Sequence, residues 1–86
     1  MRTGEIWRFR FGDKARLQKG YIKIIKKVDL DRWQVQHCYR NIAANKIVKS
    51  IEFYSYPSKL IIQDYEKVYD EEELALFENM ENMEEQ

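Results

Sequence analysis

Hydrophobic and polar residues alternate most regularly in residues 21–39, and the rest of the chain is organised around this stretch. Its first arm, residues 21–28, is dense in β-branched and aromatic side chains, and its second arm, residues 32–39, alternates strictly. Period-2 alternation directs one set of side chains toward a core and the other toward water. The two arms flank Asp29-Leu30-Asp31, where short Asp side chains cap bent backbone. The pattern therefore predicts a β-hairpin.

Each arm of the predicted hairpin has two sides. The apolar side of the second arm consists of Trp33, Val35, His37 and Tyr39, and its other side consists of Gln34, Gln36, Cys38 and Arg40. The inward side of the first arm consists of Ile22, Ile24 and Val28, interrupted by Lys26, and its solvent side consists of Tyr21, Lys23, Ile25 and Lys27. Lysines on an edge strand also discourage intermolecular pairing, which is a purely structural explanation for them.

A shorter strand is predicted before the hairpin, over residues 4–11. One of its sides is aromatic and is expected in the core rather than on a binding surface, and it holds Trp7, Phe9 and Phe11. The other side holds Ile6, Arg8 and Arg10, so the two arginines would project outward together. A polar connection follows, in which we expect exposed basic side chains at Lys14, Arg16 and Lys19.

The chain after the hairpin predicts two further strands. Residues 41–45 form a connection, and residues 46–54 form a strand whose imperfect alternation indicates a twist or a bulge. Residues 55–58 break this strand, because Pro57 cannot donate to a central ladder but suits the first turn of a helix. We expect one or two helical turns over residues 58–65, then a short closing strand over residues 66–69 with Val68 inward.

An acidic segment, residues 70–86, follows the predicted strands. Asp70 and Glu73 have the spacing of a capping box, and three Glu residues in the first turn suit the positive end of a helix dipole. The predicted helix of about 15 residues would be marginal alone in water, so it must dock on this chain, on a second copy or on a partner. Its apolar stripe consists of Leu74, Phe77, Met80 and Met83. The alternative is a frayed acidic tail after Phe77.

Composition points to one small globular domain. The chain has 86 residues, of which 35% are charged and 44% are hydrophobic, which is typical of soluble globular proteins. Its single cysteine permits no intrachain disulfide framework, which fits a reducing cytoplasm, and we expect the protein there. The first eleven residues lack the apolar region of an export signal, and no run approaches the roughly 18 residues of a membrane span. We therefore expect no membrane partner.

The net charge of zero conceals a strong asymmetry. Residues 1–50 hold 13 Lys and Arg against 4 Asp and Glu, a balance of +9, and residues 51–86 hold 2 against 11, a balance of −9. A basic body with an acidic tail is a recurring layout in nucleic-acid-binding and regulatory proteins. The alternative is chance clustering of charges on a solvated surface.

Candidate catalytic and metal-binding residues are sparse. His37 and Cys38 are adjacent, so on a strand they point to opposite sides, and the chain has no other His or Cys with which to bind zinc. His37 is expected to be a hydrogen-bonded core or boundary residue. Asp29 and Asp31 are explained by the turn, and the three Gly residues are too scattered for a phosphate-binding loop. We therefore expect no enzyme, no catalytic residue, no metal and no cofactor.

Three runs carry a resemblance to a known family: GEIWRFRFGD, YIKIIKKVDLDRWQV and FYSYPSKLIIQDYEKVY. Over roughly residues 4–69 the chain resembles the small SH3-like (Tudor/KOW-like) barrel proteins of bacteria and their phages. The resemblance implies a mainly β, five-stranded antiparallel barrel with a short helical turn before the last strand and no catalysis. We thus expect a small β-barrel domain at residues 1–69 and an acidic amphipathic helical tail at residues 70–86, the tail being a departure from the family.

Two classes of binding function follow. In the first, which the charge asymmetry favours, the basic body binds RNA or DNA, exposed Tyr21 stacks on a base, and the acidic tail competes for the basic face. Phosphates would be neutralised by Arg8, Arg10, Lys14, Arg16, Lys19, Lys23, Lys27 and Arg40. In the second, the protein is an adaptor or inhibitor, for example a phage product acting on a host protein, and its helix inserts Leu74, Phe77, Met80 and Met83 into a groove. Homodimerisation through the same helix is a third possibility.

Overall fold

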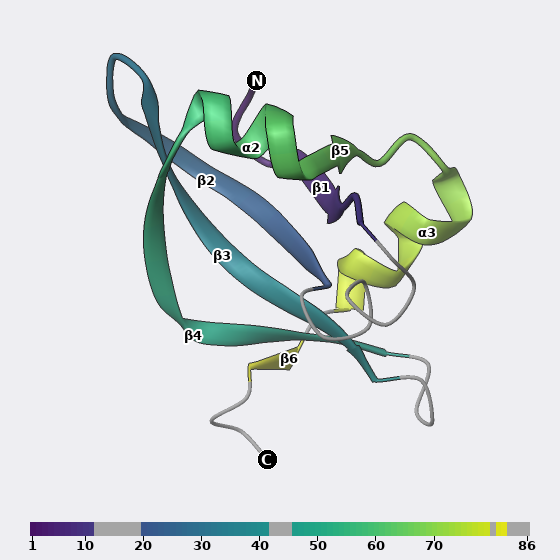
Figure 1. The fold of residues 1–86 in the computed structure, drawn as a ribbon. Coiled ribbons are helices and arrows are strands. Elements are labelled where there is room, and N and C mark those ends of the chain that lie inside the picture. Colours follow the sequence, from purple (N-terminus) through teal and green to yellow (C-terminus); the bar gives the residue numbers. More distant parts are fainter. Residues whose placement is uncertain (12–19, 42–45, 80, 83–86) are drawn as a thin grey trace.

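The computed structural model describes residues 1–11, 20–41, 46–79 and 81–82, and these form one six-stranded sheet (Figure 1). Five strands are antiparallel in the order β5-β1-β2-β3-β4, and β6 joins β4 in parallel at the edge. The strands are β1 (Ile6–Phe9), β2 (Tyr21–Asp29), β3 (Arg32–Asn41), β4 (Lys46–Pro57), β5 (Tyr65–Lys67) and β6 (Glu81–Asn82). The helical elements are α2 (Ser58–Asp64), α3 (Glu71–Ala75) and the 3-10 helix η1 (Leu76–Asn79). The prediction of a mainly β fold is confirmed.

The central hairpin forms as predicted. Strands β2 and β3 are joined by Leu30 and Asp31, with Asp29 directly opposite Arg32. The Leu30 backbone N–H donates to the Asp29 side chain at 2.8 Å, so the Asp caps the turn.

A β-bulge in β2 changes which side chains share a face. Ile24 lies opposite Val35, but Lys26 lies opposite Gln34 and Lys27 opposite Trp33, so one extra residue is inserted after Ile24. Since opposite residues share a face of the sheet, Lys26 joins Gln34, and Lys27 joins Trp33 on the other face. The prediction that Lys27 shares a face with Lys23 is therefore wrong, because the bulge inverts the alternation between them.

One face of the sheet, which we call the α2 face, is covered by α2. Its buried residues include Ile22, Ile24, Val35 and Tyr65, with Ile61 of α2 inserted among them. Trp7 and Phe9 pack against this cluster, as predicted, together with Trp33, Tyr56, Leu60 and Met1. Phe11 and Val28 are 50% and 47% exposed, so the expectation that they face the core is wrong. Phe11 lies beyond the end of β1, and Val28 lies at a second register irregularity near the hairpin turn.

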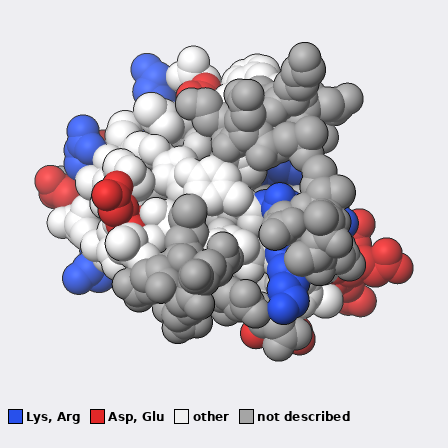
Figure 2. All heavy atoms as spheres, turned by 90° about the horizontal axis from the view of Figure 1, so that it is seen from below, with Lys and Arg blue, Asp and Glu red and all other residues white. Residues whose placement is uncertain are grey.

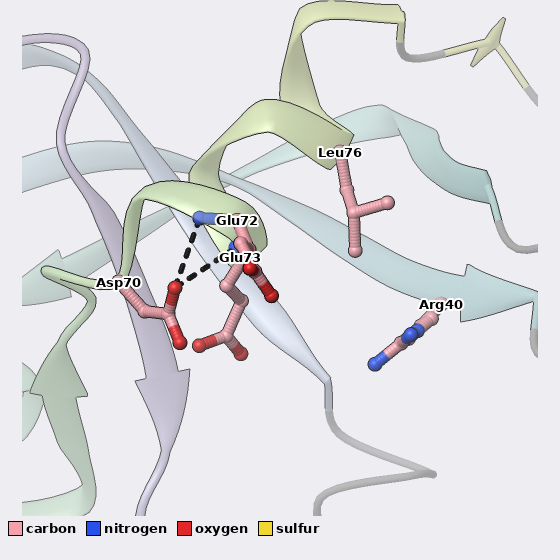
Figure 3. A pocket seen from close by; sticks show the side chains of 5 residues that line it. All are labelled: Arg40, Asp70, Glu72, Glu73 and Leu76. Atoms are coloured by element: carbon pink, nitrogen blue, oxygen red, sulfur yellow. Dashed lines mark hydrogen bonds between the residues drawn. The ribbon is translucent and has the colours of Figure 1, made fainter.

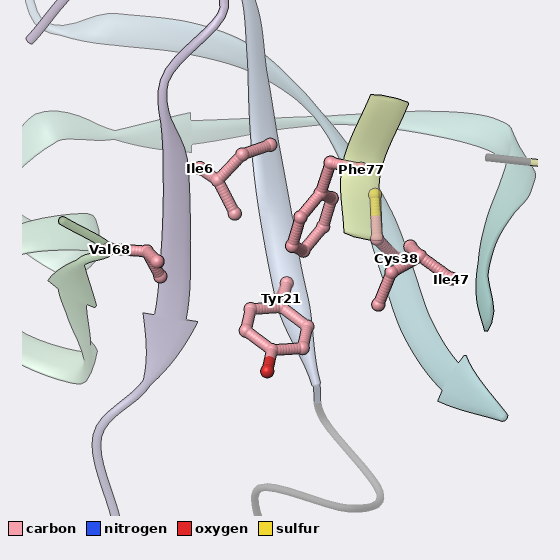
Figure 4. Close-up of a cluster of buried hydrophobic side chains, with 6 residues drawn as sticks. All are labelled: Ile6, Tyr21, Cys38, Ile47, Val68 and Phe77. Carbon is pink, nitrogen blue, oxygen red and sulfur yellow. The ribbon is translucent and has the colours of Figure 1, made fainter. Parts of the chain in front are cut away.

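The opposite face, which we call the α3 face, carries a second core (Figure 4). Its members come from β1 to β4, from the segment after β5 and from η1, and they are Ile6, Tyr21, Cys38, Ile47, Val68 and Phe77. Leu74 and Leu76 pack against them. The expectation that Tyr21 and Cys38 face water is therefore wrong, because the acidic segment docks here and buries a second side of the sheet.

Strand β4 is longer than predicted. Residues 55–57 remain paired, with Tyr56 opposite Trp33 and Pro57 opposite Arg32, so the expected break at residue 55 is wrong. Pro57 ends the strand and precedes the helix α2, since its φ of −67° suits a helix start. The predicted irregularity of β4 is confirmed by a register shift: Gln36 lies opposite Phe53, but Cys38 lies opposite Lys49. The predicted helical turns and closing strand also form, and Val68 is buried.

The acidic segment docks on its own sheet but forms a shorter helix than predicted. Asp70 caps α3 by accepting from the backbone N–H groups of Glu72 and Glu73, and after Ala75 the chain continues as the 3-10 helix η1. Phe77 of η1 is buried against Tyr21, with ring centroids 4.9 Å apart and the planes at 84°. The chain then forms β6 beside Val48 and Lys49 of β4, so a helix of about 15 residues is wrong. Met80 and Met83 lie outside the residues described at side-chain level.

Two features of the prediction stay open. In the described part of the chain, β5 and β6 stand at the two edges of an open sheet, so a closed SH3-like barrel stays a prediction, as does the division at residue 70. None of the described helices is both long and apolar enough to cross a membrane.

Candidate nucleic-acid interface

Arg8 lies on the α3 face, where two carboxylates of its own chain hold it. Its Nη1 donates to Glu73 Oε1 at 2.6 Å, and its Nε donates to Glu66 Oε1 at 3.2 Å. Partial burial disfavours the Arg8 charge, but the hydrogen bonds to Glu73 and Glu66 outweigh this and raise the pKa of the guanidinium. Arg8 is therefore not an open phosphate ligand in this arrangement.

Tyr21 is buried rather than exposed, so the expectation that it stacks on a base is wrong. Only 7% of its surface is accessible, and its hydroxyl donates to Glu73 Oε2 at 2.5 Å. Burial and this hydrogen bond raise the pKa of Tyr21 to about 12. Tyr21 thus fixes the acidic segment to the sheet.

Arg10 connects β1 to the segment that contains α2 and β5. Its Nη2 donates to the backbone carbonyl oxygens of Ile62 at 2.9 Å and Tyr65 at 2.8 Å. This gives Arg10 a structural role in holding β1 to its neighbours. The predicted basic connection with Lys14, Arg16 and Lys19 lies outside the described residues.

Arg40 is exposed at the far end of β3 and lines an open hollow of about 480 Å³. The other lining residues are Asp70, Glu72, Glu73 and Leu76, all from the acidic segment (Figure 3). The first turn of α3 therefore faces both Arg8 and Arg40, and two of the predicted phosphate ligands have carboxylates of their own chain beside them.

A second group of cations lies further along the α3 face. Lys23 lies opposite Gln36, Lys26 opposite Gln34, and Lys49 opposite the buried Cys38. We call Lys23, Lys26 and Lys49 the lysine patch. Lys26 is exposed and the other two are half-buried.

The buried thiol of Cys38 lies on the strand between two of these lysines. Burial raises the pKa of Cys38 to about 12, while the positive charges of Lys23 and Lys49 act in the opposite direction. Lys23 and Lys49 are on strands β2 and β4, which flank the strand β3 that carries Cys38. A thiol so protonated and buried is inert.

Strand β4 adds an exposed phenyl ring to this face. Phe53 lies opposite Gln36 and is 50% exposed. Tyr54, the next residue, lies opposite Val35 on the α2 face, where its hydroxyl donates to Glu52 at 2.7 Å. An exposed phenyl ring therefore lies on the face that carries the lysine patch, while the neighbouring Glu52 carboxylate accepts a hydrogen bond from a tyrosine on the other face.

Figure 2 shows the molecule from below in Figure 1, the side where β4 and β6 lie. Among the described residues on this side, both Lys/Arg and Asp/Glu side chains border the white, uncharged area, and the largest group of Asp and Glu side chains stands at the right margin, where α3 lies in Figure 1. The basic and acidic parts of the surface are thus neighbours in the folded chain.

The sequence pattern missed Lys26, Lys49 and Phe53 as site residues. The available signal was Lys26, which interrupts an otherwise apolar side of the first hairpin arm. A charged residue at an inward position is a mark of a bulge, which returns it to the polar face. Lys27, predicted to bind phosphate, is exposed on the α2 face instead.

His37 belongs to an aromatic group on the α2 face with Tyr39, Tyr54 and Tyr56. It is 9% exposed, and its Nε2 lies 2.7 Å from the Tyr56 hydroxyl, as expected for a hydrogen-bonded boundary histidine. Its ring is stacked with Tyr39 and perpendicular to Tyr54 and Tyr56. Within the described ranges, no group of three or more His, Cys, Asp or Glu residues could hold a metal ion.

Comparison of the chain with models of known families, with curated proteins and with solved structures finds no match. The functional conclusions therefore depend on the side-chain chemistry described above.

Proposed function

We propose that the protein is a non-enzymatic module that binds nucleic acid through the α3 face of its sheet. The observation that carries the proposal is the lysine patch, in which Lys23 and Lys26 lie beside the uncharged side chains of Gln36 and Gln34, and Lys49 lies opposite Cys38 on the same face. Lysines on a rigid sheet can neutralise phosphates and release their counterions, which supplies most of the affinity of nonspecific binding. The proposal requires no catalytic residue and no cofactor.

The acidic segment limits this interface. Its carboxylates engage Arg8 and face Arg40, so a phosphate near these arginines meets repulsion. Binding is thereby restricted to the lysine patch, and nonspecific affinity is lowered.

We also propose that the sheet is an SH3-like barrel. Two features support this assignment: β1 pairs with both β2 and β5, and the short helix α2 precedes the closing strand. The second feature was implied by the family resemblance of residues 4–69.

The alternative function, insertion of the helix into a partner's groove, is disfavoured by the burial of Phe77. Its ring is 9% exposed and packs on Tyr21 in the core of this chain. A partner could take Phe77 only after α3 and η1 leave the sheet, which would expose Ile6 and Cys38 to water. A homodimer formed through this helix would expose the same core residues to water.

The proposal is tested by comparing Lys26→Ala with Lys27→Ala in an oligonucleotide-binding titration at several salt concentrations. The two lysines are adjacent and exposed on one strand but lie on opposite faces, so they are a matched pair. We expect affinity to fall steeply with salt, and Lys26→Ala to weaken binding and reduce the log–log salt slope by about 1. Lys27→Ala should behave as wild type. Equal effects of both variants, or no salt-dependent binding, would overturn the proposal.

A further inference from the structure

Phe53 is exposed at a position where the sheet offers it no apolar neighbour directly across the ladder. It lies opposite Gln36, whose side chain is 7% exposed and donates from Nε2 to the Ser50 carbonyl oxygen at 2.5 Å. The sheet surface beside Phe53 is thus polar, and its Gln36 side chain is held in place by this hydrogen bond. A half-exposed phenyl ring on such a surface is available to a flat ligand.

The charged side chains on the same face of the sheet as Phe53 indicate which kind of flat ligand fits. Lys23 lies opposite the same Gln36, and Lys49 lies on the same strand as Phe53. An exposed ring on a face that also carries these cations matches a ligand that alternates flat apolar groups with anions. A nucleic acid strand has this alternation of bases and phosphates.

We propose, on the basis of the nucleic-acid-binding function above, that the ligand is single-stranded and that Phe53 stacks on an unpaired base. A duplex keeps its base faces stacked inside and presents only phosphates, sugars and base edges, so the phenyl ring would find no partner. In a single strand the base turns onto the ring while the lysine patch binds the flanking phosphates. Base–aromatic stacking tolerates any sequence, because every base has a π-face.

The neighbouring ring, Tyr54, is a poorer platform and therefore a useful control. It is 42% exposed, but it stacks with Tyr56 at a centroid distance of 6.2 Å and contacts His37 edge-on. Its hydroxyl donates to Glu52, whose charge repels phosphate. Phe53 and Tyr54 are thus adjacent exposed rings on opposite faces, the first on the face of the lysine patch and the second hydrogen-bonded to a carboxylate.

The test is a titration of a single-stranded oligonucleotide, and of a duplex of the same sequence, into wild type, Phe53→Ala and Tyr54→Ala at one salt concentration. We expect wild type to prefer the single strand, and Phe53→Ala to weaken single-strand binding by about 5- to 150-fold, the loss of one stacked base. Duplex affinity should not change, because the phosphate contacts remain. Tyr54→Ala should match wild type for both ligands.

A second variant, Phe53→Trp, guards against loss of folding in Phe53→Ala. It should retain single-strand affinity, and its added indole fluorescence should be quenched on binding beyond any change seen in wild type. An equal loss on both ligands, no loss, or a preference of wild type for duplex would overturn the single-strand inference and leave the proposed function standing. The absence of binding to either ligand would overturn both.

Discussion

The Glu73 carboxylate connects the acidic segment to the sheet through two side-chain hydrogen bonds. One of its oxygens accepts from Arg8 and the other from Tyr21, while Asp70 caps its backbone N–H. Only 14% of the Glu73 side chain and 29% of the Arg8 side chain are accessible to water. Charged hydrogen bonds with this much burial contribute more than surface ion pairs.

We therefore predict that Glu73→Gln lowers the free energy of unfolding by about 1–3 kcal/mol, because it removes the negative charge that accepts hydrogen bonds from Arg8 and Tyr21. Urea denaturation measures the change. The control is Glu72→Gln, which alters an exposed neighbour and should change stability by no more than about 0.5 kcal/mol. Similar losses for the two variants would contradict the role of Glu73.

The raised pKa of the buried Cys38 thiol predicts that the protein loses stability at alkaline pH. Its pKa is raised from 9.0 to about 12 by burial, so the folded state keeps the proton that the unfolded state loses. Stability is complete below about pH 9 and falls by up to about 1.4 kcal/mol per pH unit until the pH passes the folded pKa. Urea midpoints of wild type should fall between pH 8 and pH 10.5, and Cys38→Ala should remove part of this fall. An identical pH dependence in the variant would refute this assignment.

At the scale of elements, the alternation predicted the central hairpin but not the bulge in β2. Period 2 fixes the face of each residue only while the ladder is regular, and one inserted residue reverses every later assignment. This is why Lys27 was assigned to the binding face and Lys26 was not. Lys26 on the apolar side signals an irregular ladder, but the position of the bulge depends on packing against β3, which the sequence pattern does not contain.

The acidic segment shows that the local sequence pattern also does not determine where a helix ends. Its apolar residues recur every three positions, at Leu74, Phe77 and Met80, which is the period of a 3-10 helix rather than of an α-helix. The Asp70 cap was predictable from local chemistry and is observed. The end of α3 after Ala75 was not, because it is set by the docking of Phe77 on Tyr21, a contact between distant parts of the chain.

The position of α3 predicts that its charge lowers nucleic-acid affinity. Replacing Glu71 and Glu72 by Gln should raise affinity about two- to fourfold at low salt, because two exposed negative charges near the ligand are removed. The gain should vanish at high salt, where charges of this kind are screened, and this provides an internal control. Unchanged affinity at low salt would mean that the segment does not limit binding.

At the scale of the whole molecule, a hydrophobic core packs on each of the two faces of one sheet. Trp7 and Trp33 pack on the α2 face, and Phe77 packs on the α3 face. Removing residues 70–86 would therefore strip a core as well as a set of charges. Charge variants test function more cleanly than truncation.

Because both cores pack on one sheet, we predict that a destabilising substitution on the α3 face changes the unfolding transition reported by the tryptophans on the α2 face. Phe77→Ala should lower the free energy of unfolding by about 3 kcal/mol, measured by tryptophan fluorescence in urea, because it leaves a cavity against Tyr21 and Cys38. Leu30→Ala, at the 85% exposed hairpin tip, is the control and should have little effect. An unchanged transition in Phe77→Ala would mean that the acidic segment is a separate unit, as the predicted division at residue 70 has it.

The central claim is that the α3 face of the sheet, and not the α2 face, binds nucleic acid. Side-chain NMR signals of the full chain, followed during titration with a single-stranded oligonucleotide, test it most directly. We predict that the largest shifts occur at Lys23, Lys26, Lys49 and Phe53, with Lys27, Trp33 and Tyr54 unaffected. Shifts concentrated at Lys27, Trp33 and Tyr54, with the lysine patch unchanged, would contradict it.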